Sequence, residues 1–326
     1  MNGPALVLVD PNGGALSGPE RELLTLARSV SPGQAPCVVW LGQASEAPVS
    51  ELGQYGVATV YVPELGGHDR HVAAAAAEAI AAVLRESAAA ALLFPSTFEN
   101  KEVAAVIAVL LGTGVVVDGS RLDLDADSLV VEKTVLAGTW TSRCTVTREP
   151  VLLGMKAHAV EPEPAAAASQ PTVVGVPVSF SPAAAAVRVV ERTERHASGG
   201  RPELPEARVV VVGGRGTEGD FSTVEELADA LGGAVGATRV ATDEGWIDHS
   251  AQIGQTGVTV APKLYIGAGV SGAIHHRSGM QAAETIVAVN TDADAPIFEM
   301  ADLGIVGDLN DVLPQAAAEI RRLRGE

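Results

Sequence analysis

The sequence predicts an α/β protein with two parallel-sheet, Rossmann-like domains, the first of which carries an antiparallel β appendage. Short apolar runs alternate with helical stretches over the first third of the chain, and the same rhythm returns after residue 207. Hydrophobic residues make up 47% of the chain and aromatic residues only 3%. The core must therefore consist of Val, Leu, Ile and Ala, which suits strands buried on both faces. A linker at residues 195–206, rich in Gly, Pro and charge, places one domain at residues 1–198 and the other at 199–326.

The first domain reads as strands with helices between them. The expected strands are Ala5–Val9, Cys37–Leu41, Thr59–Val62, Ala91–Phe94 and Val115–Val117. The expected helices are residues 19–29, 44–54, 70–86 and 99–111. Strands that alternate with helices in this way form a parallel sheet with right-handed crossovers.

The pattern changes between residues 129 and 190, where Thr and Val predominate and helical periodicity is weak. Four strands are expected there, Val130–Leu136, Thr139–Thr147, Val151–Met155 and Thr172–Phe180. We assign all four to the antiparallel appendage of the first domain. Glu161–Pro171, with its prolines and an alanine run, reads as a loop.

The second domain repeats the alternation of strands and helices. Strands are expected at Arg208–Val212, Leu264–Ile266, Thr285–Val289, Pro296–Phe298 and Leu303–Val306. Helices are expected at Phe221–Leu231 and Val312–Leu323, and Gly272–Glu284 reads as a loop that leads into a helix.

Charge and cysteine content narrow the class of protein. The net charge is −18, from 40 acidic and 22 basic residues, with no basic run to offset it. Nucleic acid and anionic membrane surfaces are therefore unfavourable partners. Cys37 and Cys144 stand alone, which fits a reducing cytoplasm. No stretch reaches 18 uncharged apolar residues, so no membrane insertion is expected.

Two glycine-rich turns follow expected strands of the second domain. Gly213–Gly216 contains Arg215, which suits a phosphate contact, although a plain turn with a solvated arginine is an equal alternative. Gly267–Gly272 is a G-x-G-x-x-G motif, but the next strand ends in Asn290 where an acidic ribose ligand would be expected. The motif is thus weak as a plain NAD site and stronger as a place where backbone approaches a dinucleotide.

A polar segment and a pair of histidines complete the candidates. Gln252–Gly257 offers amides and a hydroxyl that suit the edge of a heteroaromatic ring, or else forms a generic loop. The adjacent His275 and His276 point in different directions, so no metal site is expected. No nucleophilic triad has local support, so no catalytic residue is assigned.

In this order, these segments resemble the α subunits of electron-transfer flavoproteins, the FixB-type family. The resemblance covers the second domain through IGQTG (253–257), LYIGAGVSGAIHHRSGMQAAETIVAVNTDADAPIF (264–298) and ADLGIVGDL (301–309). Over the first domain it is looser and rests on element order and fragments such as VLLGMKAH (151–158).

The resemblance implies an FAD held by the second domain, with the first domain facing a partner β subunit. The implied flavin contacts are Arg215, Thr238, Arg239, Gln252, Ile253, Gly254, Gln255, Thr256, Ser271, Gly272, Ala273, Ile274, His275, His276, Asn290 and Asp308. In the family, Arg239's counterpart lies over the isoalloxazine ring and Thr256's hydroxyl faces flavin N5. His276's counterpart approaches the C2 carbonyl, where a charge on His276 would stabilise a negatively charged reduced flavin, while Asn290 and Asp308 serve the adenosine end.

The implied function is electron transfer without a substrate of its own. Electrons pass from dehydrogenases to an acceptor such as a membrane quinone oxidoreductase, through a heterodimer with a β subunit. The alternative is an NAD(P)-dependent oxidoreductase or transhydrogenase-like module that uses Gly267–Gly272. One departure matters, because His275 places a titratable ring where the family usually has Gln.

Overall fold

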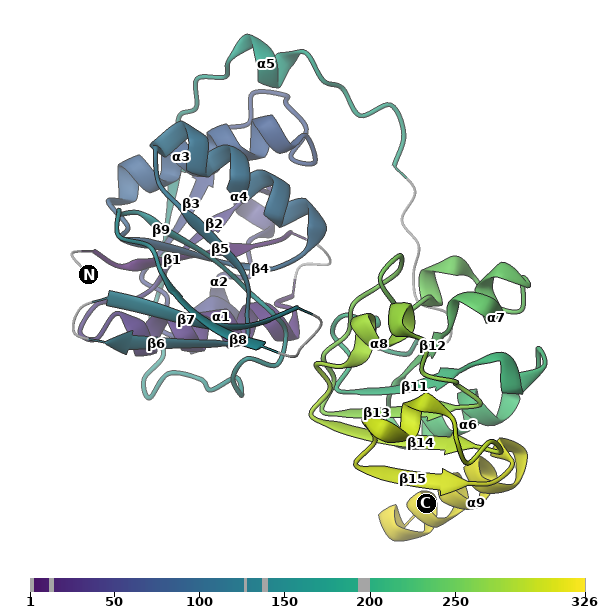
Figure 1. Ribbon diagram of the computed structural model, residues 1–326. Helices are drawn as coiled ribbons and strands as arrows, with labels where there is room; N and C mark the ends of the chain where they lie inside the picture. Colours follow the sequence, from purple (N-terminus) through teal and green to yellow (C-terminus); the bar gives the residue numbers. More distant parts are fainter. Residues whose placement is uncertain (1–2, 12–14, 126–127, 137–139, 193–199, 326) are drawn as a thin grey trace. The chain divides into compact units, whose positions relative to one another are not determined.

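The computed structural model describes residues 3–11, 15–125, 128–136, 140–192 and 200–325 (Figure 1). The chain divides into two compact units, residues 1–135 with 141–193 and residues 136–140 with 194–326. Each unit contains its own parallel sheet, and the first also contains an antiparallel sheet. The predicted fold class is therefore confirmed.

The first unit is built on a seven-stranded sheet in which every neighbouring pair is parallel. In spatial order its strands are β10 (Thr172–Val176), β3 (Thr59–Pro63), β2 (Cys37–Trp40), β1 (Ala5–Val9), β4 (Ala91–Pro95), β9 (Val151–Met155) and β5 (Val115–Gly119). Its helices are α1 (Gly18–Val30), α2 (Val49–Gln54), α3 (Ala73–Ser87), α4 (Phe98–Leu111) and the single turn α5 (Pro182–Ala185).

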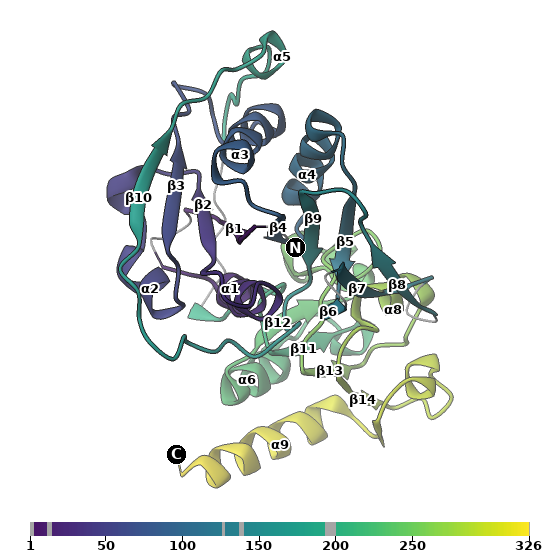
Figure 2. The ribbon, with the colours of Figure 1, turned by 90° about the vertical axis from the view of Figure 1, so that its left-hand side faces the viewer.

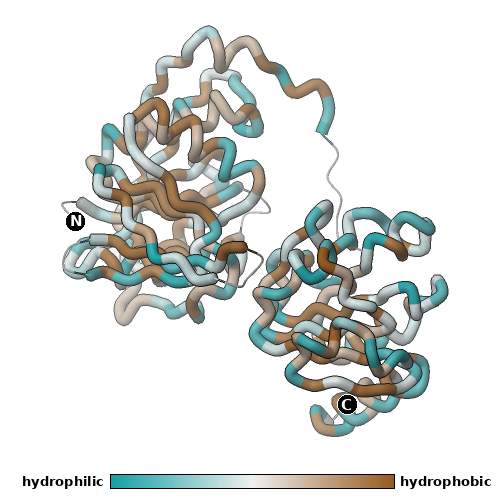
Figure 3. Tube along the Cα trace, viewed as in Figure 1, coloured by the Kyte–Doolittle hydropathy of each residue, from teal (hydrophilic) through white to brown (hydrophobic). Residues whose placement is uncertain are grey.

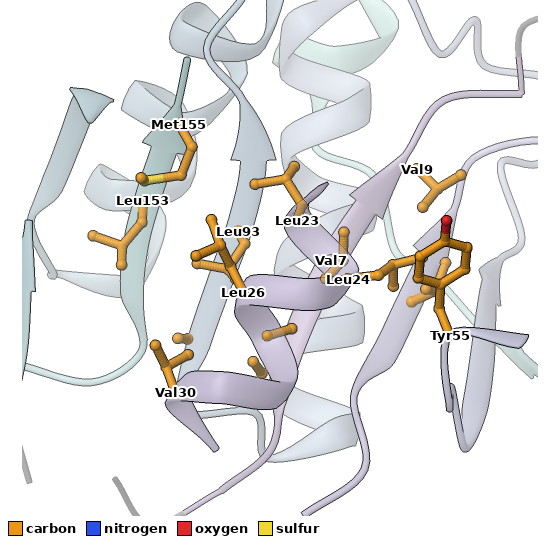
Figure 4. Packing of buried hydrophobic residues seen from close by; sticks show 14 of the residues in the cluster. Val7, Val9, Leu23, Leu24, Leu26, Val30, Tyr55, Leu93, Leu153 and Met155 are labelled. Carbon is orange, nitrogen blue, oxygen red and sulfur yellow. The ribbon is translucent and has the colours of Figure 1, made fainter. Parts of the chain in front are cut away.

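Helices cover both faces of this sheet (Figure 2). Val7 of β1 packs with Leu23 and Leu24 of α1 in one core (Figure 4). The next residue, Leu8, belongs to the opposite core with Ile80 of α3. Successive side chains of a strand point to opposite faces, so a continuous apolar run serves both cores. Hydrophobic stretches accordingly run through the interior of each unit (Figure 3).

The antiparallel appendage is smaller than expected. It consists of β6 (Arg121–Asp125), β7 (Ser128–Val135) and β8 (Trp140–Thr145), with β6 and β7 paired antiparallel. Assigning Val151–Met155 and Thr172–Phe180 to it was wrong, since β9 and β10 are parallel strands of the main sheet. All five residues of β9 are buried, as expected of a strand covered on both faces. Thr139, where the second of the four expected strands was to begin, lies outside the described residues, as do residues 195–199 of the expected linker.

The second unit has a five-stranded sheet in the order β12 (Ala234–Ala237), β11 (Val209–Gly213), β13 (Leu264–Ala268), β14 (Thr285–Asn290) and β15 (Leu303–Val306). All its neighbouring pairs are parallel. The helices are α6 (Ser222–Leu231), α7 (Arg239–Asp243), α8 (Ile274–Met280) and α9 (Leu309–Arg324). Strand β12 was not predicted from the sequence. Its four residues, AVGA, lie between Gly233 and Thr238 and carry little hydrophobic signal.

Two boundaries in the second unit differ from expectation. Pro296–Glu299 is a 3₁₀ helix where a strand was expected, because a proline has no N–H for a sheet ladder and fits the first turn of a helix. Helix α9 begins at Leu309, three residues earlier than expected, because the Asp308 side chain accepts from the amide of Asn310 and caps it. Among the described residues, no helix is long and apolar enough to cross a bilayer.

Candidate functional site

The predicted site residues converge on one edge of the five-stranded sheet. Each strand of the sheet ends at one of them or shortly before it. Strand β11 leads to Arg215, β12 to Thr238, β13 to Ser271 and β15 to Asp308, and Asn290 is the last residue of β14. The strands are parallel, so these carboxyl ends share an edge. The chain runs from β11 outward to β12 and then returns to β13 on the other side of β11. This reversal of strand order is where open α/β sheets bind ligands.

The two glycine turns pack backbone against backbone at this point of reversal. The amide of Gly214 donates to the Ala268 carbonyl at 3.0 Å, and the amide of Gly216 donates to the Gly269 carbonyl at 3.1 Å. A Cβ on Gly269, whose φ is +62°, would lie 2.7 Å from Cα of Gly216. A Cβ on Gly272, with φ +82°, would lie 2.5 Å from the amide nitrogen of Ile297. Only glycine satisfies both demands.

This packing leaves donors for an anionic ligand. Within the described residues, the amides of Ser271, Gly272 and Ala273 donate to no protein acceptor. The exposed Arg215 side chain likewise has no hydrogen-bond or ion-pair partner there. Backbone amides and a guanidinium are the groups that bind a phosphate or pyrophosphate, so the donor set fits a dinucleotide.

Gln252 is buried beside the end of β12, and its side chain links Thr242 to Thr256. The amide of Ile253 donates to the Ala237 carbonyl at 2.9 Å, which extends the sheet edge. The Gln252 Oε1 accepts from the Thr242 hydroxyl at 2.9 Å, and its Nε2 donates to Thr256 Oγ1 at 3.0 Å. Because Thr256 Oγ1 accepts this bond, the hydroxyl proton of the exposed Thr256 stays available for a ligand.

Arg239 follows Thr238 in the sequence. The Thr238 amide donates to the Gly213 carbonyl at 3.0 Å, and this bond holds Thr238 at the edge of the sheet. The Arg239 side chain is 62% exposed, and its Nε lies 3.1 Å from Oδ2 of Asp243 one helical turn later. An exposed pair of this kind contributes little free energy and dissociates easily. In this structure Arg239 is therefore a surface cation at the site, whereas the resemblance implies one that lies over a ring.

His276 is the most constrained of the predicted contacts. Its side chain is 6% exposed, its Nδ1 lies 2.9 Å from the Ile253 carbonyl oxygen, and its Nε2 lies 2.7 Å from the Tyr265 hydroxyl. Burial lowers the pKa of His276 to about 4, an effect that the hydrogen bond to Ile253 partly offsets. The ring is therefore neutral at pH 7, and it does not supply the positive charge that the resemblance implied.

His275 and Gln255 link helix α8 to the polar segment. The amide of Gln255 donates to the His275 carbonyl at 2.8 Å, and both side chains are exposed. Gly254 packs directly on α8, because a Cβ on it would lie 2.8 Å from that same carbonyl oxygen. Ile274 leaves 77% of its surface exposed. The start of α8 thus presents one histidine outward and buries the other.

Asn290 and Asp308 are engaged within the domain. Asn290 donates through Nδ2 to the Val270 carbonyl at 2.9 Å and accepts on Oδ1 from the Asp292 amide at 3.0 Å. Asn290 therefore holds the glycine turn in place. Asp308 is the exposed N-cap of α9, with Oδ1 2.8 Å from the Asn310 amide.

The predicted residues thus differ in burial. Exposed side chains can touch a ligand directly, and they belong to Arg215, Arg239, Gln255, Thr256, Ser271, Ala273, Ile274, His275 and Asp308. Thr238 and Asn290 are half-buried. Buried ones hold the loops, as do Gln252, Ile253 and His276. Sequence reasoning missed Thr242 and Tyr265, which orient Gln252 and His276. A lone buried Tyr in a strand gives no signal by itself, although Tyr265 lies within the run that carries the resemblance.

A parallel sheet with open phosphate donors at the reversal of its strand order is the architecture of proteins that bind dinucleotide-type cofactors. Comparison with known families then gives the particular class. Residues 5–181 match the electron transfer flavoprotein domain, and residues 203–281 match the electron transfer flavoprotein FAD-binding domain. The chain belongs to the electron transfer flavoprotein family and is an α subunit of it.

Full-length relatives agree with this assignment. The chain is 41% identical over 324 residues to the electron transfer flavoprotein subunit alpha of Mycobacterium leprae, covering 98% of this chain and 99% of the relative. It is 34% identical over 328 residues to the protein of that name from Syntrophomonas wolfei, covering 97% and 98%. For the Bacillus subtilis protein of that name the identity is 30% over 326 residues, covering 99% of each chain.

Proposed function

We propose that this chain holds one FAD at the edge of the five-stranded sheet and carries electrons between dehydrogenases and an acceptor, as a heterodimer with a β subunit. The observation that carries the proposal is the meeting of Arg215, Arg239, Thr256 and the amides of Ser271–Ala273 at the reversal of strand order. Bound FAD supplies one- and two-electron redox chemistry, and the protein supplies binding and electrostatics. No substrate of its own is assigned.

Each group has a task that suits its position. The amides of Ser271–Ala273 and the Arg215 guanidinium would bind the pyrophosphate. Thr256, held by Gln252, would donate a hydrogen bond from its hydroxyl to the edge of the flavin ring. Arg239 would add positive charge beside the ring. Because His276 is neutral, the stabilisation of negative charge on the reduced cofactor is assigned to Arg239.

The partner is supported by the names of the relatives and by the exposure of the contacts. The relatives are called subunit alpha, which implies a second subunit. The cofactor-facing side chains Arg239 and Ile274 remain 62% and 77% exposed within this chain. A partner would cover them, and desolvation would strengthen every polar contact to the flavin.

Co-expression with a β subunit tests the proposal. We expect a yellow heterodimer with one FAD per α chain, and an isolated α chain that loses most of its flavin during gel filtration. Absorbance spectra and FAD released on denaturation measure both. A colourless heterodimer that FAD cannot reconstitute would refute cofactor binding. Stoichiometric FAD on the isolated chain would refute the need for the partner.

The alternative, an NAD(P)-dependent oxidoreductase, has less support at the residue level. A dinucleotide fingerprint requires a free polar ribose ligand at the end of the next strand. Asn290 occupies that position, and both ends of its side-chain amide already bind protein backbone. Turnover of NAD(P)H by the purified heterodimer alone, without a dehydrogenase, would favour this alternative.

The exposed His275 stands where the family usually has Gln, at the start of the helix that binds the polar segment. We expect His275→Gln to change the midpoint potential of the bound FAD, because the exposed ring adjoins the segment that presents Thr256. His68→Gln is the control, because His68 stacks on Phe180 in the other unit with ring centroids 4.0 Å apart. Equal potentials for the wild type and His275→Gln would show that this side chain does not act on the cofactor.

A further inference from the structure

A chain of hydrogen bonds runs through the buried centre of the second unit. Tyr265, the second residue of β13, is 0% exposed, and its hydroxyl lies 2.7 Å from Nε2 of His276 on α8. Nδ1 of that ring lies 2.9 Å from the Ile253 carbonyl oxygen in the polar segment beside β12. Three elements that are separate in sequence are therefore tied together by one imidazole.

The donor and acceptor chemistry of Tyr265, His276 and the Ile253 carbonyl fixes the position of each proton in this series of hydrogen bonds. A carbonyl oxygen only accepts, so Nδ1 of His276 must carry a hydrogen and donate to Ile253. The Nε2 of a neutral ring is then an acceptor, and the Tyr265 hydroxyl donates to it. Among the described residues the tyrosine hydroxyl has this one hydrogen-bond partner. The polar atoms of this Tyr265–His276–Ile253 series are thus all hydrogen-bonded, with one possible assignment of donors and acceptors.

We propose that Tyr265 is a positioning residue for the cofactor loops, which holds His276 uncharged and fixes, through its ring, the segment that presents Gln255 and Thr256. This rests on the proposed function for the identity of the cofactor, and goes beyond it in assigning a role to Tyr265. The same α8 turn also binds the Gln255 amide through the His275 carbonyl at 2.8 Å. The polar segment is therefore attached to α8 at two points, and rotation of the His276 ring would break the one at Ile253.

The arrangement resists protonation. A second proton on the His276 ring would make the Tyr265 hydroxyl an acceptor and leave its own proton without a partner in a buried place. Burial also lowers the pKa of His276 to about 4 and raises that of Tyr265 far above its usual range. The titratable group that faces the ring is Tyr265 on β13, and the segment beside β12 contributes only the Ile253 carbonyl.

Side-chain ¹⁵N NMR of the histidines in the cofactor-free, full-length chain tests the proposal without any flavin. His276 is assigned from the signal lost in His276→Gln. In the wild type we expect the Nδ1–H tautomer and no titration of His276 above pH 5. In Tyr265→Phe the Nε2 resonance should shift and the pKa of His276 should rise by about one pH unit, because a hydrogen bond to the neutral ring is lost. Tyr55→Phe, at a buried tyrosine of the other unit, should change neither.

FAD binding by the heterodimer gives the second readout. Tyr265→Phe should raise the FAD dissociation constant about tenfold, which corresponds to one ordinary hydrogen bond lost from the scaffold of the site. Tyr55→Phe should leave it unchanged. An unaltered His276 spectrum in Tyr265→Phe, or an unaltered FAD affinity, would overturn the proposal. If Tyr265→Phe fails to fold, the wild-type spectrum decides, since an Nε2–H tautomer or titration near pH 6.5 would overturn it. Failure of the wild type to bind FAD would instead refute the proposed function and leave the NMR result standing.

Discussion

Gly269→Ala should destabilise the C-terminal unit by about 3 kcal/mol and abolish FAD binding. Gly269 has φ +62°, a conformation that costs an alanine about 1 kcal/mol. The new Cβ would also lie 2.7 Å from Cα and 3.0 Å from the amide nitrogen of Gly216. Neither backbone atom can move without parting the two glycine turns, and overpacking of this kind costs about 1–3 kcal/mol more. Urea unfolding measures the loss of stability, and absorbance measures the FAD.

Gly232→Ala separates backbone strain from steric overlap in the same unit. Gly232 ends α6 with φ +68°, and nothing lies within 4 Å of a Cβ added there. It should therefore lose only about 1 kcal/mol and keep its FAD. Equal destabilisation of the two variants would show that the turns can separate freely, and it would remove the packing of Gly216 on Gly269 from the explanation of the site.

The sequence predicted the parallel strands well where apolar runs end in turn residues. Ala5–Val9 and Val115–Val117 are examples, since each lies within or equals a strand of the seven-stranded sheet. It failed to assign Val151–Met155 and Thr172–Val176 to the right sheet. Strand pairing depends on partners more than 50 residues away, such as β4 for β9, and local composition does not contain that information. Pairing with distant strands, and not local composition, places these two strands in the seven-stranded sheet.

The candidate site divides in the same way. Its position could be predicted, because residues that follow parallel strands must share an edge. The state of individual side chains could not. The family resemblance implies a charge on His276, yet His276 is buried, bonded at both nitrogens and neutral at pH 7. Its neutrality follows from burial among side chains of other elements, including Tyr265, which lies 11 residues earlier.

Arg239 should set much of the potential of bound FAD, because His276 contributes no charge at neutral pH. A cation near the ring stabilises the reduced, more negative cofactor and so raises its potential. Arg239→Ala should therefore lower the first one-electron potential by about 60 mV, which corresponds to a tenfold loss of preferential stabilisation. Arg239→Lys should recover only part of this, since a compact ammonium lacks the planar stacking of guanidinium. Spectroelectrochemistry of the heterodimer measures each value.

The ion pair between Arg239 and Asp243 provides a second variant with the opposite expected shift in potential. Asp243 lies 3.1 Å from the Arg239 guanidinium and neutralises part of its field, so Asp243→Asn should shift the potential upward, opposite to Arg239→Ala. Arg322→Ala is the matched control, since Arg322 also forms an exposed pair, with Glu319, at the far end of α9. It removes the same formal charge and should leave the potential unchanged. If Arg239→Ala keeps its FAD and shows the wild-type potential, Arg239 does not act on the ring.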